Sequence, residues 1–170
     1  MAAMIAYHNR EYATSHELHH FTSFDLEKTW ECSKEEAIHR IALFSHSEHH
    51  FEISEVRGAT VAFMMLAGKY DLVAVTARDP KSAPRTLPLI EKLFGDLFTD
   101  VHFLGYHKSK GEFCKEQGIL FLVDDGLHNA HTAGEHGIPV YLMDRPWNQG
   151  ELPTNTVRVF GWDDVLLRVL

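Results

Sequence analysis

The sequence has few cysteines, no excess of positive charge and no long hydrophobic run. Cys32 and Cys114 are the two cysteines, they lie far apart and they form no CxxC pair, which argues against a disulfide framework and a thiolate zinc site. The net charge of −8 argues against nonspecific binding to nucleic acid or anionic membranes, because both require a basic surface. No apolar run approaches the ~20 residues that span a bilayer, and residues 1–7 lack the basic leader of a signal peptide. We therefore expect a soluble, cytoplasmic protein.

The length and composition of the chain are sufficient for one domain with a small subdomain. The chain has 170 residues, of which 45% are hydrophobic, enough for a real core. From residue 56 onward, short apolar runs alternate with helical patterns, which is typical of a Rossmann-like α/β fold with a parallel sheet and helices on both faces. The first third is instead helical, and Ser33 with Glu36 forms a capping box at the start of one helix. We predict a helical cap subdomain at residues 1–55 and an α/β core at residues 56–170.

The rest of the core is arranged around the stretch from Gly118 to Gly137. It opens with a short apolar run at 119–123, which predicts a strand buried on both faces of a parallel sheet. Asp124 and Asp125 end this strand, at the position where open α/β sheets place ligands. Oxygen ligands of this kind favour Mg²⁺ over zinc. The alternative is that the pair only caps the following helix, for which one acid would be enough.

Polar residues also stand at two other predicted junctions between strands and helices. Thr76 and Arg78 follow the predicted strand at 71–75, and Lys110 precedes the predicted helix at 111–117. These junctions lie on one edge of a parallel sheet, so they can meet the acid pair at one ligand. A hydroxyl, a lysine and a metal-binding acid pair together form a phosphate site, although each residue alone could be a strand-end cap or a solvated surface group.

These motifs resemble the haloacid dehalogenase superfamily, and within it the 5'(3')-deoxyribonucleotidase-like branch. The second, third and fourth motifs of that family resemble DLVAVTARD, KSKGEFCKEQG and FLVDDG. The tail of the branch resembles GIPVYLMDRPWNQ followed by VRVFGWDDVL, and its helical cap resembles FTSFDLEKTW with SKEEAIHRI. The resemblance covers nearly the whole chain.

The resemblance implies Mg²⁺-dependent hydrolysis of a phosphate monoester, a nucleotide-like small molecule such as a nucleoside monophosphate. It implies a cap that closes over the phosphate and selects the leaving group. It implies no nucleic-acid polymer and no membrane as partner, and it leaves a homodimer open. The residues implied to act are catalytic Thr76 and Lys110, substrate-binding Thr76, Ala77, Arg78 and Lys110, and metal-binding Asp124 and Asp125.

The chain departs from the family at the first motif. Phosphatases of this family begin with a strand that ends in DxD, whose first aspartate is the nucleophile and whose second is the general acid–base. No DxD occurs in the sequence, and Met1 to Tyr12 resembles the helix that follows this motif. We therefore expect the chain as it stands to be inactive, and the hypothesis is a shortened start that omits the central strand. The alternative is a non-catalytic HAD-like pseudoenzyme that binds a nucleotide or phosphate.

Two clusters of histidines suggest an alternative hypothesis, a zinc site, because imidazole is a common zinc ligand. The clusters are His16, His19 and His20 in one loop, and His46, His49 and His50 in another. Their spacings match neither HExxH nor a zinc finger, so we do not expect a closed site. A response-regulator reading is also disfavoured, since such domains place their acid pair at the first strand.

Aromatic residues of the predicted cap allow two interpretations. Phe21, Phe24, Trp30 and Phe51 could stack on a nucleobase, and Trp147 in the DRPWNQ loop is a similar case. A small subdomain needs such rings for its own core, so the core interpretation is favoured.

Overall fold

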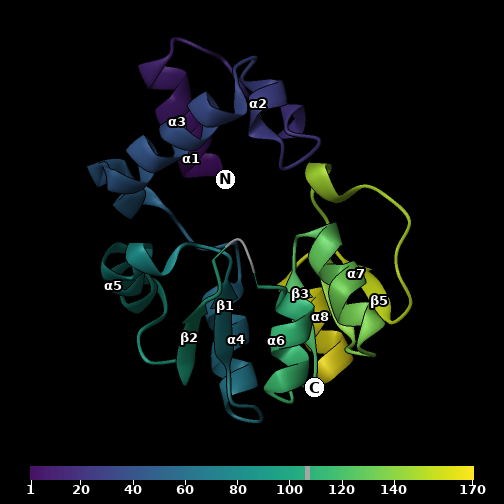
Figure 1. Ribbon diagram of the computed structural model, residues 1–170. Coiled ribbons are helices and arrows are strands. Elements are labelled where there is room, and N and C mark those ends of the chain that lie inside the picture. The colour runs from purple at the N-terminus through teal and green to yellow at the C-terminus, as the bar shows by residue number, and fades with distance from the viewer. Residues whose placement is uncertain (106–107) are drawn as a thin grey trace. The chain divides into compact units, whose positions relative to one another are not determined.

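The computed structural model describes residues 1–105 and 108–170, which form two compact units (Figure 1). The first unit consists of Met1–Ser54 with Pro146–Gln149, and the second of Glu55–Arg145 with Gly150–Leu170. Among the described residues, no helix is long and apolar enough to cross a membrane.

The first unit is helical and has its own core. Phe21 is fully buried there and Trp30 nearly so, while Phe24 is 54% exposed. The core interpretation therefore holds for Phe21 and Trp30. The predicted helix start at Ser33 is confirmed, because the Ser33 hydroxyl accepts a hydrogen bond from the Glu36 amide. The elements are α1 (Ala2–Glu11), η1 (Leu18–His20), α2 (Leu26–Thr29), α3 (Lys34–His46), η2 (Glu48–Glu52) and η4 (Pro146–Asn148).

The second unit alternates helices and strands, which confirms the predicted α/β class. Every strand pairing among the described residues of the unit is parallel. The unit contains α4 (Ala59–Ala67), β1 (Val73–Thr76), η3 (Pro80–Ser82), α5 (Ala83–Phe94), β2 (Asp100–Phe103), α6 (Lys110–Glu116), β3 (Leu122–Asp124), α7 (Leu127–Glu135), β4 (Val140–Met143), β5 (Thr156–Val159) and α8 (Trp162–Val169).

The strands form two sheets, β1–β2 and β3–β4–β5. The largest error in a predicted strand boundary is at β3, which begins at Leu122 and not at residue 119; the strand predicted at 71–75 is β1 at Val73–Thr76, and the helix predicted at 111–117 is α6 at Lys110–Glu116. Leu120 is 69% exposed, and the ladder to β4 starts only where Leu122 pairs with Val140. The apolar run is therefore longer than the strand that it contains.

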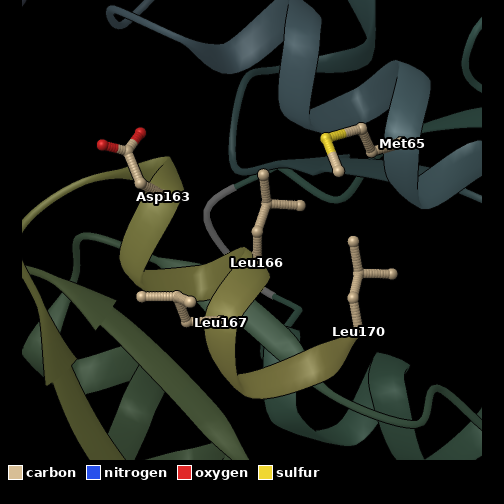
Figure 2. Close-up of a pocket in the computed structure, with 5 residues that line it drawn as sticks. All are labelled: Met65, Asp163, Leu166, Leu167 and Leu170. Carbon is tan, nitrogen blue, oxygen red and sulfur yellow. The ribbon is translucent and has the colours of Figure 1, made fainter.

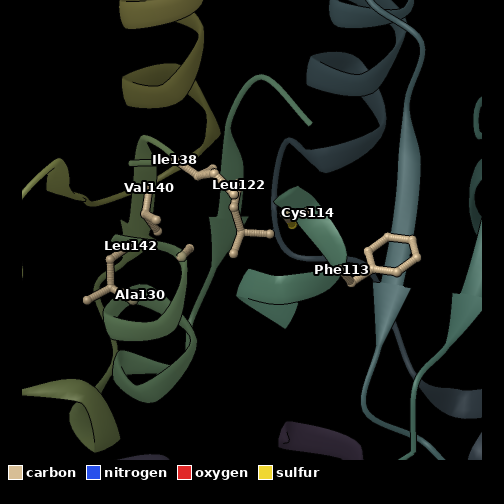
Figure 3. Packing of buried hydrophobic residues seen from close by; sticks show 8 residues of the cluster. Phe113, Cys114, Leu122, Ala130, Ile138, Val140 and Leu142 are labelled. Atoms are coloured by element: carbon tan, nitrogen blue, oxygen red, sulfur yellow. The ribbon is translucent and has the colours of Figure 1, made fainter. Parts of the chain in front are cut away.

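Helices cover both faces of the three-stranded sheet, as the side chains of β4 demonstrate. Val140 and Leu142 belong to one buried cluster with Phe113 and Cys114 of α6 (Figure 3). The alternate residues Tyr141 and Met143 pack in a second cluster with Val165 of α8. Because successive strand residues point to opposite faces, α6 and α7 cover one face and α8 covers the other.

Candidate functional site

Three of the predicted site residues stand at element ends in the second unit. Thr76 is the last residue of β1, Asp124 is the last residue of β3, and Lys110 is the first residue of α6. The structure joins two of them directly, since Lys110 Nζ lies 2.7 Å from Asp124 Oδ2. Only 16% of the Lys110 side chain and 4% of the Asp124 side chain are exposed. Charge-assisted contacts of this length, shielded from water, are among the stronger polar interactions in proteins.

The second carboxylate oxygen of Asp124 is held by two further donors. Its Oδ1 accepts hydrogen bonds from the Gly126 amide at 2.7 Å and from Asn129 Nδ2 at 2.9 Å. Asp124 does not cap α7, because the N-cap of this helix is Gly126 and no side chain caps it; its carboxylate instead orders the loop that leads into α7. A methyl group at Gly126 would lie 2.7 Å from Asn129 Nδ2 and 3.0 Å from Asp124 Oδ1, so a larger side chain would displace these groups.

Asn129 is a positioning residue that sequence reasoning missed. Its only signal in the sequence is its spacing, because a residue five positions after the acid falls in the first turn of α7, on the side that faces the loop. An amide at this place is common in any helix, so the spacing alone could not distinguish it from a surface residue.

Gly111 was also missed, and it sets the close approach of α6 to α7. A Cβ at this position would lie 2.3 Å from the Thr132 carbonyl carbon and 2.4 Å from the Thr132 oxygen. The backbones of the two helices therefore touch where α6 begins, directly beside Lys110. This contact fixes the start of α6, and with it the lysine, against the helix that follows the acid pair.

Asp125 differs from its neighbour in its electrostatic surroundings. Burial raises the pKa of the Asp125 carboxyl above its usual range, and the adjacent Asp124 charge raises it further. The cations Lys110 and Arg145 oppose this shift and favour the ionised form. A half-buried acid of this kind, with an anion beside it, gains stability when another cation approaches.

The Thr76 group forms a local network of its own. Thr76 Oγ1 accepts a hydrogen bond from the Arg78 amide at 3.2 Å, and the Arg78 guanidinium donates to Thr86 Oγ1 of α5 at 3.0 Å. Ala77 lies between them as the first residue after β1. The strand end is thus a turn stabilised by the threonine hydroxyl, and the arginine is directed to α5.

The carboxylate oxygens of Asp124 and Asp125 are ligand atoms of the type that Mg²⁺ prefers. Asp124 and Asp125 offer only oxygen, and Mg²⁺ in proteins is commonly held by one or two carboxylates together with waters and substrate phosphate. Both Asp124 oxygens already accept hydrogen bonds, one of them from the Lys110 cation. Within the described ranges, no group of three or more His, Cys, Asp or Glu side chains could hold a metal. This statement includes the described histidine clusters, so the zinc reading gains no support.

Two hollows of about 500 Å³ lie in the second unit. One is an apolar groove between α4 and α8, lined by Met65, Leu166, Leu167 and Leu170 with Asp163 at its edge (Figure 2). None of the predicted site residues lines this groove, so we do not identify it as the phosphate site. The other is more polar, and its lining includes Arg57 and Arg145. Arg145 is one of the two cations that favour the ionised form of Asp125, which links this second hollow to the acid pair.

Comparisons with known proteins agree with this geometry at the level of the fold. The solved structure of a haloacid dehalogenase-like family hydrolase from Streptococcus pneumoniae superposes with a TM-score of 0.71 over 98% of this chain and 89% of that chain, at 16% sequence identity. The chain has a haloacid dehalogenase-like fold. In sequence it is 27% identical over 169 residues to a Bacillus subtilis protein named Putative nucleotidase YqfW, covering 93% of this chain and 81% of that protein. No protein-family model matches the sequence.

Proposed function

We propose that the second unit binds a phosphate monoester together with Mg²⁺ at the site formed by Lys110, Asp124 and Asp125. The observation that carries the proposal is the buried Lys110–Asp124 ion pair, with Asp125 beside it. The resemblance to phosphatases of the haloacid dehalogenase type and the likeness to a nucleotidase support a phosphate ester as the ligand class. A nucleoside monophosphate is the specific candidate.

In this proposal each residue of the site has one task. Asp125 holds the cation, and Asp124 holds Lys110 in place while it adds negative charge beside the metal. Lys110 neutralises charge on the phosphoryl oxygens, and the Thr76 hydroxyl with the amides of Ala77 and Arg78 binds them. Mg²⁺, when bound, stabilises negative charge on the phosphoryl group. Asn129 and Gly126 keep the Asp124 carboxylate oriented toward the lysine.

Hydrolysis through a phosphoenzyme needs a further carboxylate, which attacks phosphorus as the ester oxygen leaves with a proton. We assign no residue of this chain to that role, because the sequence contains no DxD. Asp124 is unsuited to it, since Lys110, Gly126 and Asn129 occupy both of its oxygens. We therefore propose binding without turnover for the chain as it stands, which is the function of a nucleotide- or phosphate-binding pseudoenzyme.

Titration calorimetry with a nucleoside monophosphate and Mg²⁺, beside phosphate release from an aryl phosphate, tests both parts of the proposal. We expect Mg²⁺-dependent binding and no phosphate release. Asp125→Asn should abolish the Mg²⁺ dependence, and Asp96→Asn, at an exposed acid after α5, should leave it unchanged. Absence of binding by the folded protein would overturn the site, and phosphate release lost in Asp125→Asn would overturn the lack of turnover.

A further inference from the structure

Helix α4 of the second unit is apolar on its outer side as well as on its inner side. Thr60 is its single polar residue. The inner side is buried through Ala59, Ala62 and Leu66. The outer side carries three apolar residues at helical spacing, each more than half exposed, and these are Val61, Met64 and Met65. Helices that are apolar all round are normally covered on every side, so the outer side of α4 has the composition of an interface.

Helix α8 lies beside α4 and runs in the same direction. Where both helices begin, a Cβ on Gly58 would lie 3.8 Å from Asp163 Oδ1. Where both end, Lys69 Nζ donates to the Val169 carbonyl at 3.1 Å. The outer side of α8 extends the apolar surface of α4. Together they form the α4–α8 face, which consists of Val61, Met64, Met65, Leu166, Leu167 and Leu170.

The α4–α8 face contains a hollow and a projection side by side. The hollow is the apolar groove of about 500 Å³, in which Leu166 and Leu170 point toward Met65 (Figure 2). The projection is Leu167, which is 86% exposed and points away from Met65. A surface that carries both features can pair with a copy of itself, because a twofold axis places each projection in the groove of the other copy.

The area of the face matches what a homodimer requires. Its five most exposed residues present about 500 Å² of apolar surface, which is near the upper limit for one patch on a monomer. A stable interface buries about 800 Å² per partner, and about 65% of a homodimer interface is apolar. The α4–α8 face therefore supplies nearly all the apolar area that one partner must contribute.

Exposed charges at the two ends of the face are complementary under the same symmetry. Asp163 lies at the edge of the groove where the helices begin, and Lys69 lies where they end. Two copies related by a twofold axis through the face are antiparallel. Asp163 of each copy then faces the partner's Lys69, whereas a parallel arrangement would bring like charges together and would be disfavoured.

We propose that the α4–α8 face binds a second copy of this chain in a twofold-symmetric dimer. The α4 and α8 helices of one copy pack antiparallel to those of the other, and Leu167 of each copy occupies the groove of its partner. The chain residues assigned to the phosphate site are not part of this face. The dimer therefore goes beyond the proposed function and depends on neither phosphate nor Mg²⁺.

Sedimentation velocity of the 170-residue chain tests the proposal between about 1 and 200 μM protein, a range that covers micromolar dissociation constants. We expect a reversible equilibrium between monomer and dimer without Mg²⁺ or phosphate. Leu167→Glu places a carboxylate in the apolar groove in both halves of the interface, so the dissociation constant should rise about a hundredfold. Leu120→Glu is the matched control, since Leu120 is 69% exposed and lies outside the face, and it should leave the constant unchanged. Circular dichroism verifies that each variant is folded.

Exchange of the charges at the two ends tests the antiparallel geometry. Asp163→Lys places a cation opposite the partner's Lys69, and Lys69→Asp places an anion opposite the partner's Asp163. Each single variant should weaken the dimer about tenfold. The double variant restores opposite charges across the twofold axis, so its dissociation constant should return to within about threefold of the original.

The outcomes distinguish the parts of the proposal. A dimer that is lost in Leu167→Glu, retained in Leu120→Glu and restored in the charge exchange supports it. A monomer at every concentration overturns the second copy in favour of another occupant of the face. A dimer that persists in Leu167→Glu overturns the assigned face. Oligomers that grow beyond the dimer, or a double charge variant weaker than both single variants, overturn the twofold antiparallel arrangement.

Discussion

Replacing Lys110 by methionine keeps most of the apolar side chain but removes the cation that faces Asp124. The Asp124 side chain is 4% exposed, so its charge would remain in a site that water barely reaches. The bonds from Gly126 and Asn129 would persist, but neither donor carries a charge. The perturbation therefore measures what the ion pair contributes to the stability of the second unit.

Breaking a buried pair by removal of one partner costs about 3–5 kcal/mol, because the remaining charge is buried without compensation. We expect Lys110→Met to cost about 3 kcal/mol, near the lower limit, since two hydrogen bonds to Asp124 survive. Asp124→Asn should cost a similar amount, because the lysine loses its anion. The double variant buries neither charge, so it should be more stable than the sum of the two losses by about 2–3 kcal/mol.

The assay is urea unfolding of the four proteins of this cycle, followed by circular dichroism and tryptophan fluorescence. An exposed pair supplies the control, because Lys108 Nζ lies 2.8 Å from Glu116 Oε2 with side chains 44% and 56% exposed. Lys108→Met should cost less than about 1 kcal/mol, as is typical of surface pairs. If the two Lys110–Asp124 losses are additive within about 0.5 kcal/mol, the reasoning about a buried, coupled pair is refuted.

Other predictions concern helix packing and acid stability. Gly111→Ala should lower the free energy of unfolding in urea by about 3 kcal/mol or more, because its Cβ would overlap the Thr132 backbone. Gly68→Ala is the matched control, since the nearest atom to its Cβ would be 3.5 Å away. Equal stability of the two variants would disprove the close contact. Burial, followed by the charges of Arg40 and His16, lowers the pKa of His8 from 6.5 to about 4. Neutral His8 is therefore compatible with the folded state above pH 6.5, and the free energy of unfolding falls by up to about 3 kcal/mol as the pH drops toward 4 and the unfolded chain binds the proton first. His8→Gln should show a flatter dependence of stability on pH over this range in thermal unfolding. An unchanged slope would contradict the assignment to His8.

Much of the fold follows from local patterns in the sequence. The helix predicted at 127–135 is α7 with the same bounds, because the glycines at 126 and 137 end the helical pattern on both sides. The helix start at Ser33 was also readable, since a serine hydroxyl and the amide three residues later form their bond within one turn. Polar residues at the predicted junctions between strands and helices similarly placed Thr76, Lys110 and Asp124 at element ends.

Only the tertiary structure decided what those residues do to one another. The choice of Asp124 over Asp125 as the partner of Lys110 depends on which carboxylate turns inward, and two adjacent aspartates carry no sequence signal for that difference. Asn129 and Gly111 act through contacts between separate elements, the former with the loop before α7 and the latter with Thr132.

The arrangement of the strands shows the same limit. Apolar runs identified the strands, but the separation into two sheets is a property of hydrogen bonds between distant segments. An apolar run also did not locate the start of β3, because a strand begins where a neighbour pairs with it. Local propensity and periodicity thus determined the elements, while long-range packing and pairing determined the site and the division of the strands into two sheets.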